Sequence, residues 1–507
     1  MKIQEIFSKI PLIDPTVSLE LWKKNTEILG LAYDSRKVQK DFLFFAIPGL
    51  SEDGKKYIPS AFSKGACGVV VESLQGIEEN FHDRCIIVNN IRESLAYASA
   101  NFFQRPTKNM LVIGVTGTKG KTSATFLLDA IFSAAGKKTA LLGTVECRYP
   151  GRKIKSERTT MESYDLQAFL RDALNAGAEV AILEVSSHAL SLDRVAACDF
   201  DGVLFTNLME DHLDFYGDMN SYFEAKLKLF TDFTTSKKNR NIRGISNADD
   251  SYGARVLREA KIFMKSIGLK NGDYSGAFLQ ASAIGIHGEI KLSTGVTIKV
   301  DSSLTGEFNI YNILGAAALA DQMNIAPKFI ENGIKNLTSI SGRLERVESN
   351  LPFQVFVDFA HMGSALENVL RSLRPICTGK LMLVFGAGGD RPDARRAQLG
   401  QVAAQLADYS IITSDNPRTE DPLKIIQAVE EAFLAEIQKK KKSKNYEIEP
   451  DRKLAIEKVL RMAKSGDIVC IAGKGHETGQ IIGTQVFPFD DREVAKSYLR
   501  ELEAVHS

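Results

Sequence analysis

The sequence predicts an α/β protein of three domains, and two patterns along the chain support this prediction. Short runs of apolar, β-forming residues alternate with stretches of helical composition through nearly all of the 507 residues, which is the rhythm of α/β domains. In the middle of the chain these runs are almost continuously apolar, as is typical of parallel strands buried on both faces. The length exceeds what one hydrophobic core supports and favours about three domains.

The composition is that of an ordinary globular protein and excludes several classes. Hydrophobic residues make up 44% and charged residues 25%, with a net charge of +1, so nothing favours binding to nucleic acid or to an anionic membrane. The six cysteines are scattered without a C-x-x-C pair, which argues against a disulfide framework and a zinc ribbon. The chain shows no signal-like apolar core and no run of about 18 apolar residues, so we expect a cytoplasmic protein.

The chain begins with a small α/β domain, which we place at residues 1–105. The runs L-F-F-A-I (43–47) and G-V-V-V (68–71) predict strands, and residues 58–64 predict a helix. We set the boundary at Arg105 because a residue that precedes proline is pushed out of helical conformation.

A second domain, predicted at residues 106–339, opens with the most informative stretch of the chain, V-I-G-V-T-G-T-K-G-K-T-S (112–123). A strand leads into a glycine-rich turn and then into a helical segment, the arrangement that cradles nucleotide phosphates. Lys121 is expected to reach the β- and γ-phosphates, and the Thr122 hydroxyl to bind Mg²⁺. Val115 stands where the strict pattern has glycine, so a plain turn with solvated lysines is the alternative.

Further apolar runs of this domain predict a mostly parallel sheet of the P-loop type. These runs lie at residues 139–145, 180–185 and 202–207. Alternation of period two at 276–304 indicates antiparallel strands, and 310–320 is predicted as a helix.

The third domain, placed at residues 340–507, repeats the strand–helix rhythm and is predicted to be Rossmann-like. Its predicted strands end at polar or glycine residues and lie at 353–359, 380–386, 409–415 and 467–473. Ligands of open α/β sheets bind beyond the carboxyl ends of the strands, so we expect a binding site there.

Three residues of the second domain are candidates for a cation site or its surroundings. Glu184 closes a predicted strand, where its carboxylate suits a hard cation such as Mg²⁺. Chance placement of a glutamate at a strand end is the alternative, and the pattern favours neither. His212 lies among acidic residues at 210–214, which favours a cation site over a structural histidine, with Mn²⁺ as an alternative ion. Lys226 lies on an amphipathic helix, and the local pattern alone predicts a surface lysine.

Two arginines follow strand ends in the third domain, Arg391 in G-G-D-R and Arg418 in D-N-P-R. A guanidinium fork matches a carboxylate with two parallel hydrogen bonds, so the pair indicates an anionic or amino-acid ligand. The segment G-K-G-H-E (473–477) is superficially similar to a second phosphate loop but lacks Ser or Thr after the lysine. Its Glu477 suits an ammonium group better than a phosphate.

Together these motifs resemble the Mur ligase family, whose members build the stem peptide of peptidoglycan. The resemblance covers nearly the whole chain and follows the order of the family's motifs. It includes T-G-T-K-G-K-T (116–122), E-V-S-S-H (184–188), F-T-N-L-x-x-D-H-L-D (205–214), A-K-L-K-L-F (225–230), G-E-F-N-I-Y-N (306–312), G-R-L-E-R-V (342–347), F-G-A-G-G-D-R (385–391), D-N-P-R-T-E-D-P (415–422) and A-G-K-G-H-E (472–477).

The resemblance implies an ATP-dependent amide ligase and assigns roles residue by residue. The positions that would bind ATP are Gly117, Thr118, Lys119, Gly120, Lys121, Thr122, Ser123, Asn312, Arg343 and Asp358. Those that would bind the UDP-muramoyl dipeptide are Tyr33, Ser35, Leu50, Ser51, Glu52, Thr159, Thr160, Ser186 and Arg194. Those that would bind meso-diaminopimelate are Arg391, Asp415, Asn416, Pro417, Arg418, Gly473 and Glu477.

The resemblance also implies two Mg²⁺ sites and a modified lysine. Lys226 matches the lysine that the family carbamylates with CO₂, and its carbamate would support a second Mg²⁺. Carbamylation requires a neutral amine and hence a lowered pKa of Lys226. The implied metal ligands are Thr122, Glu184, His212 and carbamylated Lys226. The implied catalytic residues are Lys121, Glu184, His212, Lys226 and Arg343.

The implied reaction forms an amide bond through an acyl phosphate. The γ-carboxylate of D-glutamate in UDP-N-acetylmuramoyl-L-Ala-D-Glu attacks the γ-phosphate of ATP, and an amino group of meso-diaminopimelate then attacks the activated carbonyl. Arg418 would clamp the distal carboxylate of diaminopimelate, which L-lysine lacks. We expect a monomer. The alternatives are a sister ligase that adds L-lysine or extends folates, and a P-loop ATPase that forms no amide bond.

Several positions depart from the family pattern. Lys119 replaces asparagine, Met209 and Glu210 replace a Ser-Arg pair, and Met-Gly-Ser follows His361 where Thr-Pro-Asp is common. Glu210 adds a negative charge near the expected metal sites. None of these changes removes an expected ligand.

Overall fold

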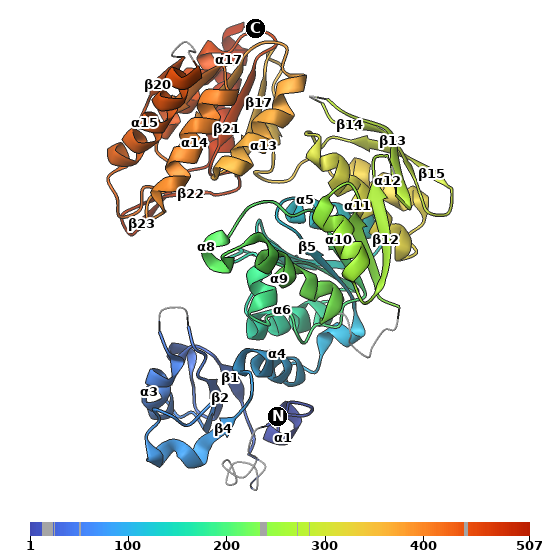
Figure 1. The fold of residues 1–507 in the computed structure, drawn as a ribbon, viewed down its shortest axis with the longest axis vertical. Coiled ribbons are helices and arrows are strands. Elements are labelled where there is room, and N and C mark those ends of the chain that lie inside the picture. Colours follow the sequence, from blue (N-terminus) through green and yellow to red (C-terminus); the bar gives the residue numbers. More distant parts are fainter. Residues whose placement is uncertain are drawn as a thin grey trace. The chain divides into compact units, whose positions relative to one another are not determined.

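The computed structural model describes residues 1–12, 24, 26–49, 52–233, 241–270, 272–282, 284–440 and 445–506. Its backbone contacts separate two compact units. Unit 1 comprises residues 1–275, 292–294 and 314–333, and unit 2 comprises residues 276–291, 295–313 and 334–507. Figure 1 colours the chain from blue at the N-terminus to red at the C-terminus.

Unit 1 begins with a parallel sheet in the order β1-β2-β3-β4. Its elements are β1 (Gly30–Ala32), β2 (Phe42–Phe45), β3 (Gly68–Val71) and β4 (Cys85–Ile87), with helices α1 (Ile3–Ile6), α3 (Ile58–Ser63) and α4 (Ile91–Phe102). The strands β2 and β3 and the helix α3 confirm the elements predicted here. The Asn90 side chain caps α4 by accepting the backbone N–H groups of Arg92 and Glu93, which satisfies donors that the first helical turn leaves unpaired.

The second sheet of unit 1 is mostly parallel, in the order β12-β11-β10-β5-β9-β6, and β7 and β8 extend it in antiparallel fashion. Its strands are β5 (Leu111–Thr116), β6 (Thr139–Leu142), β7 (Cys147–Tyr149), β8 (Arg152–Ile154), β9 (Val180–Glu184), β10 (Gly202–Phe205), β11 (Arg243–Asn247) and β12 (Phe263–Gly268). The strands β5, β9 and β10 are buried along almost their whole length. The prediction of a mostly parallel sheet buried on both faces is therefore confirmed.

Helices of this region follow the strands in the alternation that the sequence predicts. They are α5 (Lys121–Ala134), α6 (Ser163–Asn175), α7 (Ser187–Ser191), α8 (Leu213–Tyr216), α9 (Met219–Thr231), α10 (Ser251–Glu259), α11 (Phe308–Gln322) and α12 (Pro327–Asn336). The helix α11 confirms the helix predicted at 310–320. The strands β14 (Ile286–Lys291) and β15 (Thr297–Ser302) pair antiparallel, as predicted for 276–304, whereas β13 (Tyr274–Ala281) begins with a parallel pairing to β12.

The main sheet of unit 2 runs in the order β16-β17-β21-β18-β19-β20, and among its described strands only β16 is antiparallel to its neighbour. Its elements are β16 (Glu345–Val347), β17 (Gln354–Asp358), β18 (Leu381–Phe385), β19 (Tyr409–Ile412), β20 (Tyr446–Ile448) and β21 (Ile468–Ala472), with helices α13 (Gly363–Leu373), α14 (Asp393–Leu406), α15 (Pro422–Lys440), α16 (Arg452–Met462) and α17 (Asp491–His506). A hairpin of β22 (Gly479–Ile482) and β23 (Gln485–Pro488) follows β21.

Helices cover both faces of this sheet, as a Rossmann-like domain requires. Phe356 of β17 packs in the cluster formed with α13, α14 and α15, whereas its neighbours Val355 and Val357 pack with α16 and α17. Successive strand residues thus point to opposite faces, and both faces are apolar. Figure 1 shows α13, α14 and α15 beside the strands β17 and β21 in the orange and red part of the chain. Within the part of the chain that the structure describes, we find no helix long and apolar enough to span a membrane.

Candidate active site

The predicted phosphate loop lies between β5 and α5 at the carboxyl edge of the central sheet. Gly117 and Gly120 have φ of +144° and +87°, and a Cβ at Gly117 would lie 1.9 Å from the Thr206 hydroxyl oxygen. Both the backbone conformation and the space therefore require glycine at position 117. The ammonium of Lys121 donates to the carbonyl oxygens of Gly117 (2.9 Å) and Thr118 (3.0 Å), so it lies over the loop where phosphate oxygens would bind.

Val115, the departure from the strict pattern, belongs to the strand and not to the loop. Its partners are Glu184 in β9 and Leu204 in β10, and its side chain is fully buried. The chain turns only after Thr116, which pairs with Phe205. A glycine is therefore not needed at position 115, and the phosphate-loop interpretation fits the local geometry better than a plain surface turn.

Residues that follow β10 hold the loop in place. The Asn207 side chain accepts the backbone N–H of Lys119 at 3.0 Å, and the Asn207 carbonyl accepts the N–H of Thr118 at 2.9 Å. The Thr206 hydroxyl donates to the Lys119 carbonyl at 2.6 Å. These bonds connect the two motifs T-G-T-K-G-K-T and F-T-N-L, which the sequence separates by about ninety residues, into one rigid loop pair.

Glu184 closes β9 and is buried at the same edge of the sheet. One carboxylate oxygen accepts the backbone N–H of Thr144 at 2.9 Å, and the other accepts the Thr144 hydroxyl at 3.0 Å. The Thr144 hydroxyl also lies 3.0 Å from that of Thr159. The Thr160 hydroxyl donates to the Glu184 carbonyl and accepts the N–H of Ser186. The structure thus brings candidate metal and dipeptide residues together.

The remaining candidates for the nucleotide-linked dipeptide occupy unit 1 as well. Arg194 donates to Glu162 at 3.1 Å and to the Thr160 carbonyl at 3.2 Å, which places it beside the threonine pair. The Tyr33 hydroxyl donates to Asp165 at 2.5 Å, and burial together with this carboxylate raises the pKa of Tyr33. Ser35 is buried in a short 3₁₀ turn.

The predicted nucleotide loop at 50–52 is seen only in part. Glu52 is exposed and pairs with Lys56 and Tyr57. Leu50 and Ser51 lie outside the described residues.

Two histidines lie near the phosphate loop. His212 has a left-handed backbone conformation with φ of +55°, and its ring lies 4.9 Å from that of His188, centroid to centroid. Burial lowers the pKa of both histidines below the usual value of 6.5, which favours the neutral imidazole that a metal ligand requires. Asp211 lies 3.8 Å from His212 and 3.7 Å from Lys119, whereas Glu210 is exposed.

The prediction that Lys226 is a surface lysine is wrong, because the side chain is only 1% exposed. Its ammonium nitrogen donates to the Gly117 carbonyl at 2.8 Å and lies 4.6 Å from the centroid of the Tyr222 ring. Burial lowers the pKa of Lys226 well below its usual value, and the nearby charges of Lys121 and Lys119 lower it further. The helical periodicity did not predict this burial, because Lys226 lies among the buried residues of α9.

In unit 2, Arg343 lies just before β16, and Asp358 is the last residue of β17, the strand that pairs with β16. The Arg343 guanidinium lies 5.1 Å from the Phe359 ring centroid, and its buried Nε has no hydrogen-bond partner among the described residues. Both oxygens of Asp358 accept backbone N–H groups, one from Leu344 (2.7 Å) and one from Ala360 (2.8 Å). A ribose hydroxyl that bound to Asp358 would therefore share these oxygens with the two backbone N–H groups. Asn312 is buried in α11 and donates to Asn309 at 2.8 Å.

The residues of the predicted amino-acid pocket lie on the loops after β18, β19 and β21. Arg418 donates to the carbonyl of Gly389, on the loop that carries Arg391, and partial burial together with the Arg418 charge lowers the pKa of Arg391. Asn416 donates to Glu477 at 2.9 Å, and the Ile481 backbone bonds to both Asn416 and Arg418. The structure therefore brings these loops together within unit 2, as the sequence predicts.

Glycine is required beside this pocket at position 473. Its φ is +122°, and a Cβ there would lie 2.3 Å from the buried carboxylate of Asp415. Pro417 lies between Asn416 and Arg418 on the same loop, and its carbonyl would lie 1.9 Å from a Cβ at Gly389. The loops are thus packed against one another without room for added side chains.

Sequence reasoning missed three charged residues that are fully buried behind this pocket. Arg452 donates two hydrogen bonds of 2.7 Å to Asp491 and one of 2.9 Å to the Ala472 carbonyl. Lys474 is also fully buried. An arginine at a helix start and a lysine in a glycine-rich loop are usually solvated, so a single sequence offers no signal for their burial.

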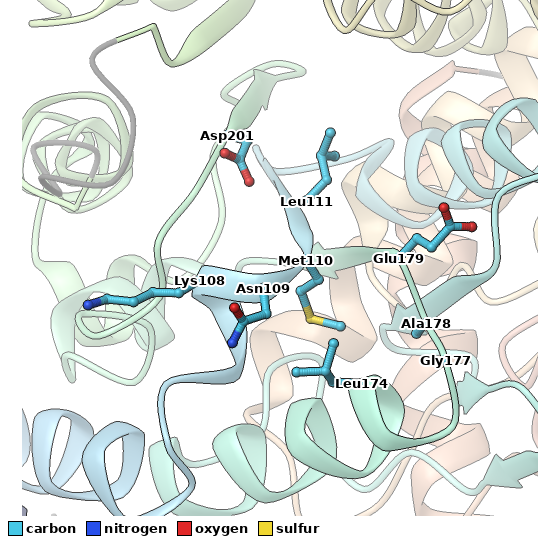
Figure 2. Close-up of a pocket in the computed structure, with 9 residues that line it drawn as sticks. All are labelled: Lys108, Asn109, Met110, Leu111, Leu174, Gly177, Ala178, Glu179 and Asp201. Carbon is cyan, nitrogen blue, oxygen red and sulfur yellow. The ribbon is translucent and has the colours of Figure 1, made fainter.

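Unit 1 also has a hollow of about 670 Å³ beside the amino-terminal end of β5. Its lining residues are Lys108, Asn109, Met110, Leu111, Leu174, Gly177, Ala178, Glu179 and Asp201 (Figure 2). These residues lie at the amino ends of β5, β9 and β10, whereas the phosphate loop lies at their carboxyl ends. Since ligands of parallel sheets bind at the carboxyl ends, this hollow is not the active site.

Comparison with known proteins identifies the family. Residues 27–103 match the model of the Mur ligase family catalytic domain, residues 115–320 the Mur ligase middle domain, and residues 342–475 the Mur ligase glutamate ligase domain. The chain belongs to the Mur ligase family, and its α/β fold with three domains is the fold of that family.

Relatives with a particular name cover almost the whole chain. The UDP-N-acetylmuramoyl-L-alanyl-D-glutamate–2,6-diaminopimelate ligase of Geobacter metallireducens is 41% identical over 94% of this chain and 95% of its own length. The ligase of the same name from Solibacter usitatus is 39% identical over 99% of this chain and 98% of its own length. A solved structure described by this name superposes with a TM-score of 0.70 at 29% identity, covering 100% of this chain and 99% of that one.

Proposed function

We propose that this chain is an ATP-dependent ligase that adds meso-2,6-diaminopimelate to the D-glutamate γ-carboxylate of UDP-N-acetylmuramoyl-L-Ala-D-Glu during peptidoglycan synthesis. The observation that carries the proposal is the contact between the loops of unit 2 that bear the predicted amino-acid pocket. The Asn416 amide bonds to the Glu477 carboxylate, and Arg418 of the same loop donates to Gly389 on the loop that carries Arg391. A ligand with both a carboxylate and an ammonium group fits this set, and diaminopimelate carries both at its distal end.

The residues of the phosphate loop would position ATP for transfer of its γ-phosphoryl group. The loop N–H groups and the start of α5 attract the phosphates, and Lys121 lies over the loop carbonyls at 2.9 and 3.0 Å. The γ-carboxylate attacks phosphorus, the bond to ADP breaks, and an acyl phosphate forms. The amine then attacks the acyl carbon, phosphate leaves with the carboxylate oxygen, and the amine loses a proton. Positioning and charge stabilisation supply the catalysis.

The substrate positions are proposed from the resemblance to the family together with the contacts described above. We propose that Thr159, Thr160, Ser186 and Arg194 hold the dipeptide, because Thr160 bonds to both Glu184 and Ser186. The uridine nucleotide is assigned to Tyr33, Ser35 and the loop 50–52. Asn312, Arg343 and Asp358 are assigned to the nucleotide of ATP. We also propose the domain limits 1–105, 106–339 and 340–507, and a monomer.

The residues present suit Mg²⁺, which ATP brings with it. In the described part of the chain no three His, Cys, Asp or Glu side chains converge on one point, so phosphate oxygens would complete the coordination of any ion. Thr122, Glu184, His212 and carbamylated Lys226 would hold two such ions, whose charge would offset that of the phosphates. The oxygen donors and the neutral imidazole fit hard cations of this kind.

The buried position of Lys226 supports carbamylation. A neutral amine reacts with CO₂ by forming a nitrogen–carbon bond and releasing a proton, and the lowered pKa of Lys226 favours the neutral form. The carbamate then presents two oxygens beside the Gly117 carbonyl and the phosphate loop. A surface lysine would remain protonated and unreactive.

Phosphate release tests the proposal. The purified protein is given ATP, Mg²⁺ and UDP-muramoyl dipeptide together with diaminopimelate, L-lysine or L-ornithine. We expect release to depend on the dipeptide and on diaminopimelate, with the other amino acids much slower. Faster release with L-lysine would support the sister ligase, and full ATP hydrolysis without dipeptide or amino acid would support a P-loop ATPase that makes no amide bond.

A further inference from the structure

The lysine of the G-K-G-H-E loop is enclosed by hydrogen-bond acceptors of unit 2. The Lys474 side chain is 0% exposed. Its ammonium donates to the Gly479 carbonyl at 2.6 Å, to the Asn416 side-chain oxygen at 3.0 Å and to Glu477 Oε2 at 3.1 Å. An ammonium has three N–H donors, and all three are used. Lys474 therefore has no donor left for a phosphate and does not act as the lysine of a second phosphate loop.

These contacts fix the orientation of the Asn416 amide. Its oxygen accepts from Lys474 and also from the backbone N–H of Ile481 at 3.0 Å, so both lone pairs are used. Its nitrogen donates to Glu477 at 2.9 Å. A flipped amide would turn its N–H groups toward the Lys474 and Ile481 donors and its oxygen toward a carboxylate. Asn416 is thereby held in one orientation.

The same contacts leave one oxygen of Glu477 available to a ligand. Oε2 accepts from both Asn416 and Lys474, whereas Oε1 has no hydrogen-bond partner among the described residues. The Glu477 side chain is 35% exposed. A partly exposed carboxylate with one oxygen anchored and the other without a protein partner is a good acceptor for an ammonium group in a defined position.

We propose that Lys474 is a positioning residue for the amino-acid substrate, because it fixes Asn416 and Glu477 and so sets where the ammonium group of that substrate binds. This inference rests on the proposed function, which supplies a substrate with an ammonium group. Lys474 also bonds to Gly479 of β22. It therefore connects the loop after β19, the loop after β21 and the hairpin into one arrangement, and it acts on the substrate only through Asn416 and Glu477.

The test separates the Michaelis constants of the three substrates. In Lys474→Met we expect the KM for diaminopimelate to rise by about 10- to 100-fold, the loss typical of charge-assisted hydrogen bonds, with the KM values for ATP and dipeptide within about twofold of wild type. The matched control is Lys453→Met, since Lys453 is 64% exposed and pairs only at 3.8 Å with Glu457. All three KM values of the control should stay unchanged. An equal rise of all three in Lys474→Met would overturn the inference.

A second variant covers the case in which Lys474→Met fails to fold because Glu477 loses its charged partner. Lys474→Gln keeps a neutral N–H donor at this position, and we expect a folded enzyme whose KM for diaminopimelate is raised while that for ATP is not. Failure of both variants to fold would show a structural role only and would overturn the inference.

A double-mutant cycle shows whether Lys474 acts through Asn416. In the Asn416→Ala background, Lys474→Met should raise the KM for diaminopimelate by less than about threefold, because the shared contact is already lost. Multiplicative effects would contradict the assignment. Wild-type turnover is measured first: no diaminopimelate-dependent turnover refutes the proposed function, whereas normal wild-type turnover with an unchanged variant refutes only the role of Lys474.

Discussion

Among the described residues, unit 1 and unit 2 each bury one lysine side chain almost completely, and the two lysines have different surroundings. Lys226 in unit 1 is 1% exposed and donates to the carbonyl of Gly117. Lys474 in unit 2 is 0% exposed and has three acceptors, one of them the carboxylate of Glu477. Burial alone therefore does not decide what a lysine does, because the groups around the two lysines differ.

The difference gives the two side chains different tasks. Near Lys226 the charges of Lys121 and Lys119 add to the effect of burial, and its pKa is lowered well below the usual value. The neutral amine is then available for reaction with CO₂. Lys474 has its full set of acceptors and connects two loops and a hairpin. One lysine is suited to chemistry, and the other to holding a pocket in shape.

The largest expected effect tests the chemical side of this comparison. Lys226→Ala should lower kcat by roughly 100- to 1000-fold, because the carbamate that would hold a Mg²⁺ ion beside the phosphates is lost. A short carboxylic acid added to the assay should restore part of the activity by taking the place of the carbamate. Steady-state kinetics with and without the acid measure this, and full activity of the variant without rescue would remove the carbamate from the account.

The next effect tests the pocket that Lys474 supports. Arg418→Ala should raise the KM for diaminopimelate by about 100-fold, the loss expected for a charge-assisted contact to a carboxylate. The KM for ATP should remain within about twofold, since Arg418 bonds to the Gly389 and Ile481 carbonyls of its own unit, whereas the phosphate loop belongs to unit 1. Equal loss of both substrates would contradict the assigned role.

A smaller effect concerns the packing of the same loops. Gly473→Ala should destabilise the protein by about 1–3 kcal/mol, because its Cβ would lie 2.3 Å from the Asp415 carboxylate at a φ of +122°. The control is Gly483→Ala, which also has positive φ but meets nothing within 4 Å. Thermal unfolding should show a larger loss at position 473. Equal losses would mean that backbone strain alone is responsible.

The smallest effect concerns the stability that Lys226 costs. In CO₂-free buffer near neutral pH, Lys226→Met should raise the midpoint of thermal unfolding by roughly 2–4 °C, because the wild type must release a proton and bury an amine on folding, whereas an apolar group of similar size needs neither. Folding lowers the pKa of Lys226, so the unfolded chain binds more protons between the two pKa values and the wild type gains stability as pH rises. The difference should therefore shrink toward pH 10. A constant difference would show that Lys226 is not titrating.

Patterns along the chain were sufficient for most of the fold. Continuous apolar runs gave β5, β9 and β10, since a strand buried on both faces has no polar face to interrupt it. Because ligands of open α/β sheets bind beyond the carboxyl ends of the strands, the sequence also predicts that the loops of the unit 2 pocket lie together.

Other features depend on burial, which a local pattern does not contain. Lys226 and Lys474 have ordinary neighbours in the sequence, and only packing from distant segments encloses them. Val115 is explained by the length of β5, which continues to Thr116, one residue beyond the position where the strict motif has its first glycine. The orientation of Asn416 follows from partners at positions 474, 477 and 481, which no spacing rule anticipates.

The most direct measurement follows oxygen from substrate to phosphate. UDP-muramoyl dipeptide labelled with heavy oxygen (¹⁸O) in the D-glutamate γ-carboxylate is turned over with ATP and diaminopimelate, and the released phosphate is analysed by mass spectrometry. If the carboxylate is activated as an acyl phosphate, one labelled oxygen appears in each phosphate, and only when diaminopimelate is present. Phosphate without label would mean that water attacks ATP directly, and the ligase account would then be wrong.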